Sequence, residues 1–293
     1  MPVDRGTLHA RRDLVQEATG TAVTQLSPVS GGDVATSFRA DLVDGSRVFV
    51  KTHPSPPPGF FTTEAAGLEW LRAADAVPVP QVIASCDGEG GRPAHLVLEW
   101  IDEGRARPTT DAELGCALAA MHDAGAPPFG REDRRTTGSR CLPNNPQPTW
   151  AAFSSSCRLI PLATIARSTG SLPRADIDAL ERLAGRLDRF DDGDPPARLH
   201  GDLWAGNRLV DTEGRSWLID PAAHGGHREF DLAMMRLFGG YAESCFDAYA
   251  EAYPLRDGWR DRIRLHQIAP LVVHAIKFGG SYVAAASAAI AAY

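Results

Sequence analysis

The sequence predicts an α+β protein of two lobes. The N-terminal lobe is expected to hold an antiparallel five-stranded sheet with one main helix, and the C-terminal lobe to be mostly helical. Short apolar segments separated by turn residues dominate residues 1–101, whereas apolar residues at helical spacing dominate residues 102–293. A chain of 293 residues is also long enough for two such lobes. We therefore expect the lobes to meet near residue 101.

The N-terminal sheet is expected from five segments in which β-forming residues lie between turn signals. These segments are 26–30, 34–42, 47–51, 81–85 and 94–100. Asp44-Gly45 is typical of the tight turn of a hairpin and joins the second segment to the third. Apolar residues at helical spacing predict a helix over 62–74, and the prolines of 77–80 end it.

The C-terminal lobe is expected to contain helices around 114–121, over 177–187 and in several segments after 229. Between them, residues 131–148 are rich in Gly, Pro, Asn and Arg, which fits either a loop on the substrate side or a surface excursion without function. The apolar run 268–276 is too short for a membrane span, so we expect a core helix there and an Ala-rich terminal helix after it.

Composition and charge exclude several classes of protein. The formal net charge is −7 and no dense Lys/Arg cluster is present, which argues against nucleic acid as a partner. The N-terminal residues 1–12 lack the apolar core of a signal peptide, so we expect no export. The five cysteines are odd in number, scattered and without C-x-x-C spacing, which argues against a disulfide framework or a zinc site. We expect a cytoplasmic protein with no membrane partner.

The strongest motif is His-Gly-Asp-Leu-Trp-Ala-Gly-Asn at 200–207, which has the H-x-D-x-x-x-x-N spacing of the kinase catalytic loop. In such a loop the aspartate, here Asp202, accepts a hydrogen bond from the attacking hydroxyl and orients it. The asparagine, here Asn207, supplies an oxygen ligand to Mg²⁺. We therefore predict Asp202 as the catalytic residue and Asn207 as a metal ligand.

A second carboxylate is expected to return to the same place. Segments 208–210 and 216–219 predict a hairpin after the loop, and it ends at Asp220. The position corresponds to that of the aspartate that binds Mg²⁺ in kinases, where its oxygens bridge the metal to the β- and γ-phosphates of ATP. An isolated Asp-Pro pair is usually only a turn, but the spacing after 200–207 favours a metal ligand.

Lys51 ends the segment Val48-Phe49-Val50-Lys51, which resembles the kinase strand whose lysine holds the α- and β-phosphates of ATP. A lysine that ends a strand is usually just solvated. Glu64, early in the helix that follows, is at the position of the ion-pair partner of such a lysine. We therefore expect Lys51 and Glu64 to form a pair at the nucleotide.

Two further segments are predicted to contact the nucleotide. Gly31, Gly32 and Asp33 follow the first strand, and glycines there would let backbone N–H groups approach the phosphates, although such a turn is more often a simple hairpin. Glu99 and Ile101 end the fifth strand at the lobe boundary, where backbone groups of kinase-like enzymes receive adenine.

With these residues placed, the chain resembles the fructosamine kinase family, a branch of the protein-kinase-like fold related to aminoglycoside phosphotransferases. The resemblance covers nearly the whole chain. It is most specific at 200–207, tryptophan included, and at Ile-Asp-Pro-Ala (219–222) followed by Gly-His-Arg-Glu-Phe-Asp-Leu-Ala-Met (226–234). Segments 30–33, 61–68, 144–150, 158–159 and 237–240 match less specifically.

The resemblance implies phosphorylation of the 3-hydroxyl of a ketosamine, a sugar adduct on an amine, whose unstable product releases the amine and so repairs glycation. For recognition we nominate Trp204, whose flat face suits a sugar ring, together with His227 and Glu229. Packing under the loop or capping of the next helix is the alternative for these residues. Asp231 is expected to hold the backbone of the catalytic loop.

Two departures from the family pattern bear on the sugar. Ala-Ala-His-Gly (222–225) replaces a tyrosine-containing stretch, and Ser154-Ser155-Ser156 replaces a more aromatic run. The phosphate loop carries Asp33 where some relatives have a cysteine, so redox control through that loop is not expected. The alternatives are a kinase of another hydroxylated amine, such as an aminoglycoside or an amino alcohol, and a catalytically silent nucleotide-binding module.

Overall fold

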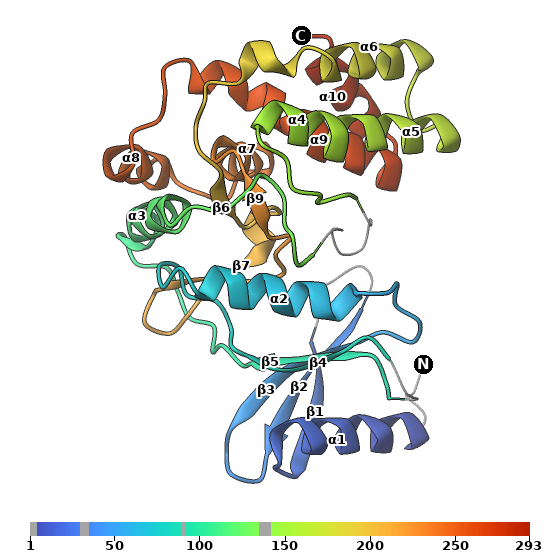
Figure 1. Cartoon of the computed structure of the whole chain (residues 1–293). Helices are drawn as coiled ribbons and strands as arrows, with labels where there is room; N and C mark the ends of the chain where they lie inside the picture. The colour runs from blue at the N-terminus through green and yellow to red at the C-terminus, as the bar shows by residue number, and fades with distance from the viewer. Residues whose placement is uncertain (1–4, 30–34, 89–91, 135–141) are drawn as a thin grey trace.

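The structure is a computed structural model that describes residues 5–29, 35–88, 92–134 and 142–293, with side chains from residue 9 onward (Figure 1). Gly31, Gly32 and Asp33 lie outside the described residues. The sheet stands at one end of the molecule and most helices at the other, with the short strands between them (Figure 1). No described helix has both the length and the apolar character needed to cross a bilayer.

The N-terminal sheet has five antiparallel strands in the order β1-β2-β3-β5-β4. Their bounds are β1 (Val23–Val29), β2 (Thr36–Leu42), β3 (Arg47–Thr52), β4 (Val82–Cys86) and β5 (His95–Glu99). The fold class predicted from the sequence is therefore confirmed, and the five segments are found within a few residues of their expected ends. β3 is a central strand, which places Lys51 opposite Leu96 of β5 inside the sheet.

Two helices cover opposite faces of this sheet (Figure 1). The expected helix is α2 (Phe60–Arg72), which packs Phe61, Leu68 and Leu71 against β5 and against the helical lobe. The sequence analysis missed α1 (Arg5–Thr19), which precedes the sheet. Its contribution to the buried core from residue 9 onward is Leu14 and Val15, too short an apolar face to stand out in a charged segment.

One helix pair lies beside the catalytic segments. α3 (Thr110–Asp123) packs against α8 (Glu243–Ala252), and Gly115 is needed there because a Cβ atom would lie 2.1 Å from the carbonyl oxygen of Cys245. Leu118 of α3 belongs to the same buried cluster as Phe61 and Leu68 of α2. A single apolar cluster therefore joins the sheet side of the molecule to the helical side.

The remaining helices build a second core, apart from one whose buried Leu232 and Met235 belong to the first cluster. They are α4 (Trp150–Ser154), a π-helical turn over Ser155–Leu159, α5 (Ile160–Thr169), α6 (Arg174–Ala184), α7 (Glu229–Phe238), α9 (Trp259–Phe278) and α10 (Ser281–Ile290). Short 3-10 turns occupy Leu187–Phe190 and Ala205–Asn207. The expected core helix near 268–276 and the terminal Ala-rich helix are thus α9 and α10.

Short strands frame the catalytic loop between these cores. β6 (Ala197–Leu199) pairs with β9 (His224–Gly226), and β7 (Arg208–Val210) pairs with β8 (Ser216–Leu218) as the predicted hairpin. In the described parts of the 131–148 segment, Arg131, Leu142 and Asn144 are buried, and the guanidinium of Arg131 lies 4.9 Å from the ring of Trp70 on α2. Glu132, Asp133, Asn145 and Pro148 are exposed, so the segment is packed at some points and open to solvent at others.

Candidate active site

Lys51 connects the sheet to the helical lobe. Side chains alternate along β3, so Val48 and Val50 pack on the α1 face while Lys51 points to the α2 face. Its Nζ donates to Glu64 Oε1 at 2.8 Å and to Asp220 Oδ1 at 2.5 Å. The structure therefore brings together three of the residues that the sequence analysis assigned to the nucleotide and the metal.

Burial and the neighbouring charges shift the pKa values of Lys51 and Glu64 within this group of three residues. Burial by itself would lower the pKa of Lys51, but the charges of Glu64 and Asp220 outweigh it and raise the pKa. Burial also raises the pKa of Glu64 to about 7 against the opposing effect of Lys51. Lys51 thus stays a cation between two carboxyl groups, and Glu64 takes up a proton more readily than an ordinary glutamate.

Asp231 holds the first residues of the catalytic loop in place. Its carboxylate accepts the backbone N–H of His200 at 2.7 Å and that of Gly201 at 2.9 Å, and His122 Nε2 lies 3.2 Å away. Asp231 is fully buried, and although burial alone would raise its pKa, the hydrogen bond and charge of His122 lower it. This is the buried backbone acceptor expected of Asp231, and it fixes the start of the loop.

Asp202 and Asn207 face each other across the loop. Asn207 Nδ2 donates to the backbone oxygen of Asp202 at 2.8 Å and to its Oδ2 at 3.1 Å. The same amide nitrogen lies 3.5 Å from the backbone oxygen of Asp220. Because the nitrogen is turned toward these oxygens, the side-chain oxygen of Asn207 is the atom left to act as a metal ligand.

The carboxyl of Asp202 sits in an environment that disfavours its charge. Burial raises its pKa to about 6; the hydrogen bond from Asn207 opposes this rise, and the negative charges of Asp220 and Asp231 add to it. A carboxylate with a raised pKa accepts a proton more readily than an ordinary aspartate. Asp202 is thus suited to receive a hydrogen bond from a hydroxyl group.

The backbone around Asp220 has a special conformation. Asp220 has φ 55°, the left-handed region that a non-glycine residue adopts rarely and that clusters at functional sites. Gly201 has φ 81°, and a Cβ atom there would lie 2.2 Å from the carbonyl oxygen of Ala222. A Cβ atom on Gly67 of α2 would lie 3.3 Å from the side chain of Pro221. The catalytic loop, the 220–222 segment and α2 are therefore packed as one unit.

Trp204 lies at the surface of the catalytic loop. Its side chain is 42% exposed, and its indole covers Gly206, where a Cβ atom would meet the ring at 2.2 Å. Phe238 at the end of α7 approaches the indole edge-on with ring centroids 6.3 Å apart. One side of the indole is therefore packed on the loop while much of the ring remains accessible to an acceptor.

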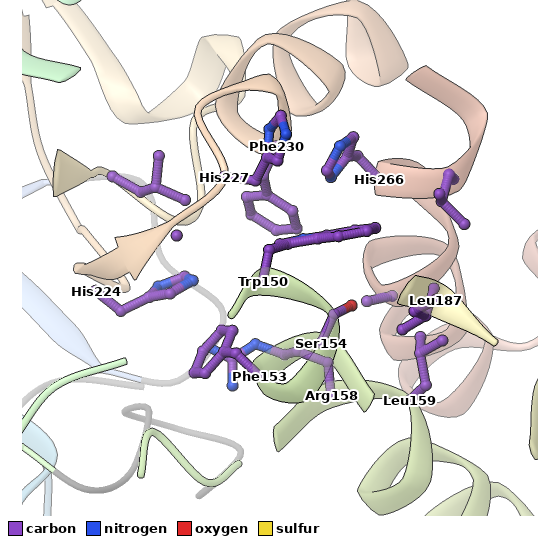
Figure 2. A pocket seen from close by; sticks show the side chains of 14 residues that line it. Trp150, Phe153, Ser154, Arg158, Leu159, Leu187, His224, His227, Phe230 and His266 are labelled. Carbon is purple, nitrogen blue, oxygen red and sulfur yellow. The ribbon is translucent and has the colours of Figure 1, made fainter. Parts of the chain in front are cut away.

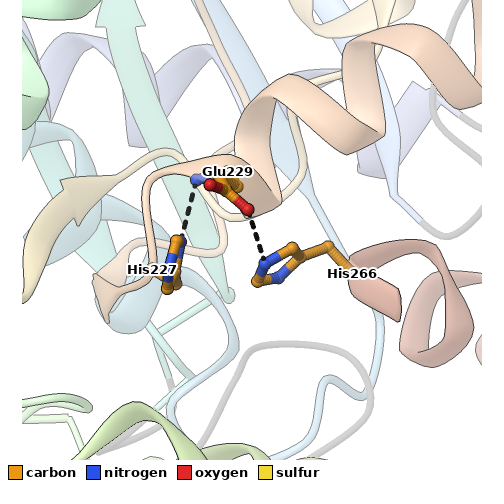
Figure 3. A group of neighbouring side chains, drawn as sticks. All are labelled: His227, Glu229 and His266. Carbon is orange, nitrogen blue, oxygen red and sulfur yellow. Dashed lines mark hydrogen bonds and ion pairs between the residues drawn. The ribbon is translucent and has the colours of Figure 1, made fainter. Parts of the chain in front are cut away.

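His227 and Glu229 are placed differently from what we expected. Both are buried, with exposed fractions of 1% and 0%. His227 Nε2 lies 3.1 Å from Asp192 Oδ1, and Glu229 binds Arg262 through both carboxylate oxygens at 2.5 and 2.9 Å. Figure 3 shows Glu229 directed at His266, whose Nε2 lies 3.4 Å away. These side chains form an internal network and offer no surface to a sugar.

This network could also be mistaken for a metal centre, since ligand atoms of His227, Glu229 and His266 lie within 4.8 Å of one another. The guanidinium of Arg262 already pairs with Glu229, and burial lowers the pKa of His266 to about 4. A fixed cation at the carboxylate repels a second one. The cavity beside the histidines, of about 30 Å³, has room for a water molecule but not for a sugar (Figure 2).

Glu99 and Ile101 lie at the end of β5, where the sheet passes into the helical lobe. The N–H of Glu99 donates to the backbone oxygen of Gln81 at 2.9 Å, and its carboxylate accepts the N–H of Gln81 at 3.1 Å. The N–H and the carboxylate of Glu99 are therefore both engaged within the sheet.

Comparison with known proteins identifies the family. The model of the fructosamine kinase family matches residues 8–293 of this chain. The chain belongs to the fructosamine kinase family. The resemblance found in the sequence is thus confirmed, and this member of the family is a phosphotransferase of bilobal, kinase-like fold.

Relatives from distant organisms support the same assignment. A probable ketoamine kinase of Enterococcus faecium is 34% identical over 260 residues, covering 87% of this chain and 90% of its own. The chloroplastic protein-ribulosamine 3-kinase of Arabidopsis thaliana is 31% identical over 290 residues, which cover 97% of this chain and 86% of the plant protein. The crystal structure of a fructosamine-3-kinase-like protein from Thermobifida fusca has a TM-score of 0.88 and 40% sequence identity. The match covers 96% of this chain and 97% of the Thermobifida protein.

Proposed function

We propose that this fructosamine kinase transfers the γ-phosphate of ATP to the 3-hydroxyl of a ketosamine such as a fructosamine or ribulosamine. The observation that carries the proposal is the convergence of Lys51, Asp202, Asn207 and Asp220. Lys51 contacts Asp220 directly, and Asn207 links Asp202 to the backbone of Asp220. These are the charges and ligands that phosphoryl transfer needs in one place.

The nucleotide would lie between β3, β5 and the 220–222 segment. Lys51 would bind the α- and β-phosphates, with Glu64 holding the lysine in position. The carbonyl of Glu99 and the N–H of Ile101 would bind the adenine edge. Gly31, Gly32 and Asp33 remain our prediction for the loop over the phosphates.

The donor atoms fit a magnesium ion. The side-chain oxygen of Asn207 and the carboxylate of Asp220 are hard oxygen ligands, and Mg²⁺ in phosphate sites is commonly held by one or two such groups together with phosphate oxygens. When bound, magnesium ATP supplies the phosphoryl group and the ion neutralises its charge. Asp220 would exchange its contact with Lys51 for the metal.

Asp202 would accept the hydrogen bond of the attacking hydroxyl and hold its oxygen in line with the phosphorus atom. Asn207, which donates to Asp202 Oδ2, fixes the carboxylate in the required orientation. The exposed indole of Trp204, two residues after Asp202, would bind the apolar face of the sugar. His227 and Glu229, which the structure buries, act instead by supporting the start of α7.

The reaction would remove sugar adducts from amines, because the 3-phosphorylated ketosamine breaks down and frees the amine. We propose the cytoplasm as its compartment, where scattered unpaired cysteines persist in the reduced state. The described cysteines, Cys86, Cys116, Cys157 and Cys245, are all free thiols.

An acceptor panel tests this function. Purified protein would be given ATP, magnesium and equal concentrations of a fructosamine, a ribulosamine, an aminoglycoside or an amino alcohol, with ADP release measured and the product located by phosphorus NMR. We expect turnover with the ketosamines and phosphate on C3. A fructosamine lacking the 3-hydroxyl is the matched control and should give no ADP above background. Turnover confined to the aminoglycoside or amino alcohol would assign the rival function.

A further inference from the structure

A row of five aromatic side chains begins at the catalytic loop and runs along the ends of three helices. Neighbouring ring centroids lie 6.3 Å apart for Trp204 and Phe238, 5.0 Å for Phe238 and His274, and 5.0 Å for His274 and Tyr282. Phe278 lies 5.5 Å from His274 and 5.9 Å from Tyr282. We call these residues the aromatic row. They come from the loop, α7, α9 and α10, so the fold assembles them from distant segments.

The two ends of the row are open to solvent, and the three rings between them are half-buried. Among the described residues, the exposed large hydrophobic side chains are Val43, Ile83, Ile160, Trp204 and Phe278. The first three lie on separate elements, whereas Trp204 and Phe278, at 42% and 52% exposure, belong to the same row. Scattered exposed apolar residues are ordinary, but two exposed aromatic side chains that are joined through half-buried rings and lie beside a reactive group mark a binding surface.

The row is continuous with the reacting end of the site. Trp204 follows Asp202 by two residues, and the turn after α7 is pressed against the loop, since a Cβ atom on Gly240 would lie 2.5 Å from that of Ala205. This contact holds the end of α7, and with it Phe238, next to Trp204. A molecule whose hydroxyl reaches Asp202 therefore meets the row as soon as it extends past the indole.

The side chains of the row indicate which kind of group fits there. Four of the five are rings of Trp, Phe or Tyr, and such rings pack well against another flat, apolar ring, either stacked or edge-to-face. The row therefore favours an aromatic substituent over a short alkyl one.

We propose that the aromatic row binds the substituent on the nitrogen of the ketosamine, and that this substituent is apolar and aromatic. The inference rests on the proposed ketosamine kinase function and deepens it. With the sugar between Asp202 and Trp204, three carbons, C1 to C3, separate the nitrogen from the reacting 3-hydroxyl. Its substituent would leave the sugar close to Trp204, and the row provides a chain of contacting rings from there to Phe278.

Two ketosamines that differ only in the ring test this inference. We would measure kcat and KM for the fructose adducts of benzylamine and of methylamine. Ring stacking of the usual strength predicts a kcat/KM about 5-fold higher for the benzyl adduct. In Phe278→Ala this preference should shrink through a higher KM for the benzyl adduct, with kcat and the methyl adduct within about 2-fold of the original protein. Phe278→Tyr keeps a ring and should keep the preference.

Ile160→Ala is the matched control, because Ile160 is 40% exposed on α5 and outside the row. It should leave both adducts unchanged. Equal kcat/KM of the original protein for the two adducts, or an equal loss for both in Phe278→Ala, would overturn the inference while leaving the kinase function intact. A change from dimer to monomer in Phe278→Ala would also overturn it, by assigning the row to contact between copies. No phosphorylation of either adduct would instead contradict the proposed function.

Discussion

Lys51 and Asp220 are 169 positions apart in the sequence, yet Lys51 Nζ lies 2.5 Å from Asp220 Oδ1. The pair joins the central strand of the sheet to the segment that follows the catalytic hairpin. Both groups have another task in our proposal, since the lysine binds phosphates and the carboxylate binds magnesium. In this proposal the nucleotide would enter at this contact and separate the two charges.

Replacing the lysine tests this arrangement. Lys51→Met should lower kcat/KM for ATP by about 100-fold or more, because the phosphates lose their cation. It should also lower the free energy of unfolding by about 2 kcal/mol, less than the full cost of an unpaired buried charge, because Glu64 can take up a proton. Steady-state kinetics and urea unfolding measure the two effects.

The double variant Lys51→Met/Glu64→Gln separates the two effects. It removes the isolated carboxyl, so it should recover most of the lost stability while remaining inactive. Recovery of activity in the double variant would show that Lys51 matters only for folding.

The anchor of the loop gives a second prediction. Asp231→Asn places an N–H₂ group where a carboxylate now accepts the backbone N–H groups of His200 and Gly201. One buried donor would lose its acceptor, which costs about 1–3 kcal/mol. We expect a lower melting temperature and a lower kcat, with the KM for ATP less affected. An unchanged kcat would show that the loop holds its shape without this contact.

A glycine pair tests the packing of the loop. Gly201→Ala should cost about 3 kcal/mol or more, because a Cβ atom would lie 2.2 Å from Ala222 O in addition to the strain of φ 81°. Gly170→Ala is the control: it has φ 64° at the end of α5 and no atom within 4 Å of the added Cβ, so it should cost only about 1 kcal/mol. Equal losses in thermal unfolding would mean that the loop can move away from Ala222.

Acid should destabilise the helical lobe through His224. Burial lowers its pKa from 6.5 to about 3, with the charge of Arg158 adding to the effect. Above pH 6.5 the imidazole is neutral in both states. Between pH 6.5 and about 3 only the unfolded chain binds the proton, so stability falls as the pH falls, by up to about 1.4 kcal/mol per pH unit.

The variant His224→Asn removes the imidazole that binds the proton in the unfolded chain. Its amide keeps a donor for the backbone oxygen of Ala222, which lies 2.8 Å from His224 Nδ1 in the original protein. Between pH 7 and pH 5 it should therefore lose roughly 2 kcal/mol less than the original protein. Urea unfolding at the two pH values measures the difference. An identical loss in both proteins would contradict a neutral, buried His224.

The sequence predicted those parts of the fold that rest on local patterns. Strand alternation and turn residues placed β3 and α2, and with them the pairing of Lys51 with Glu64, because a side chain on the α2 face of the sheet must meet that helix. The H-x-D-x-x-x-x-N spacing placed Asp202 near Asn207 for a similar reason, since one short loop carries both.

The parts that could not be predicted depend on distant segments. His227 and Glu229 follow the catalytic hairpin closely, so their place in the sequence suggested the substrate site. Their direction is set by Asp192 before β6 and by Arg262 of α9, whose charges draw them inward. The aromatic row was missed for the same reason, because Trp204 and Phe278 become neighbours of one surface only when α7, α9 and α10 are packed.

The most direct test of the account is phosphate transfer by Asp202→Asn in the presence of ATP, magnesium and a fructosamine. The substitution keeps the shape of the side chain and removes the anionic acceptor, so we predict a fall in turnover of about 100-fold or more, with ATP affinity within about 3-fold of the original protein. Phosphorylation at close to the original rate would contradict the proposed role of Asp202 and with it the convergence of charges on which the account depends.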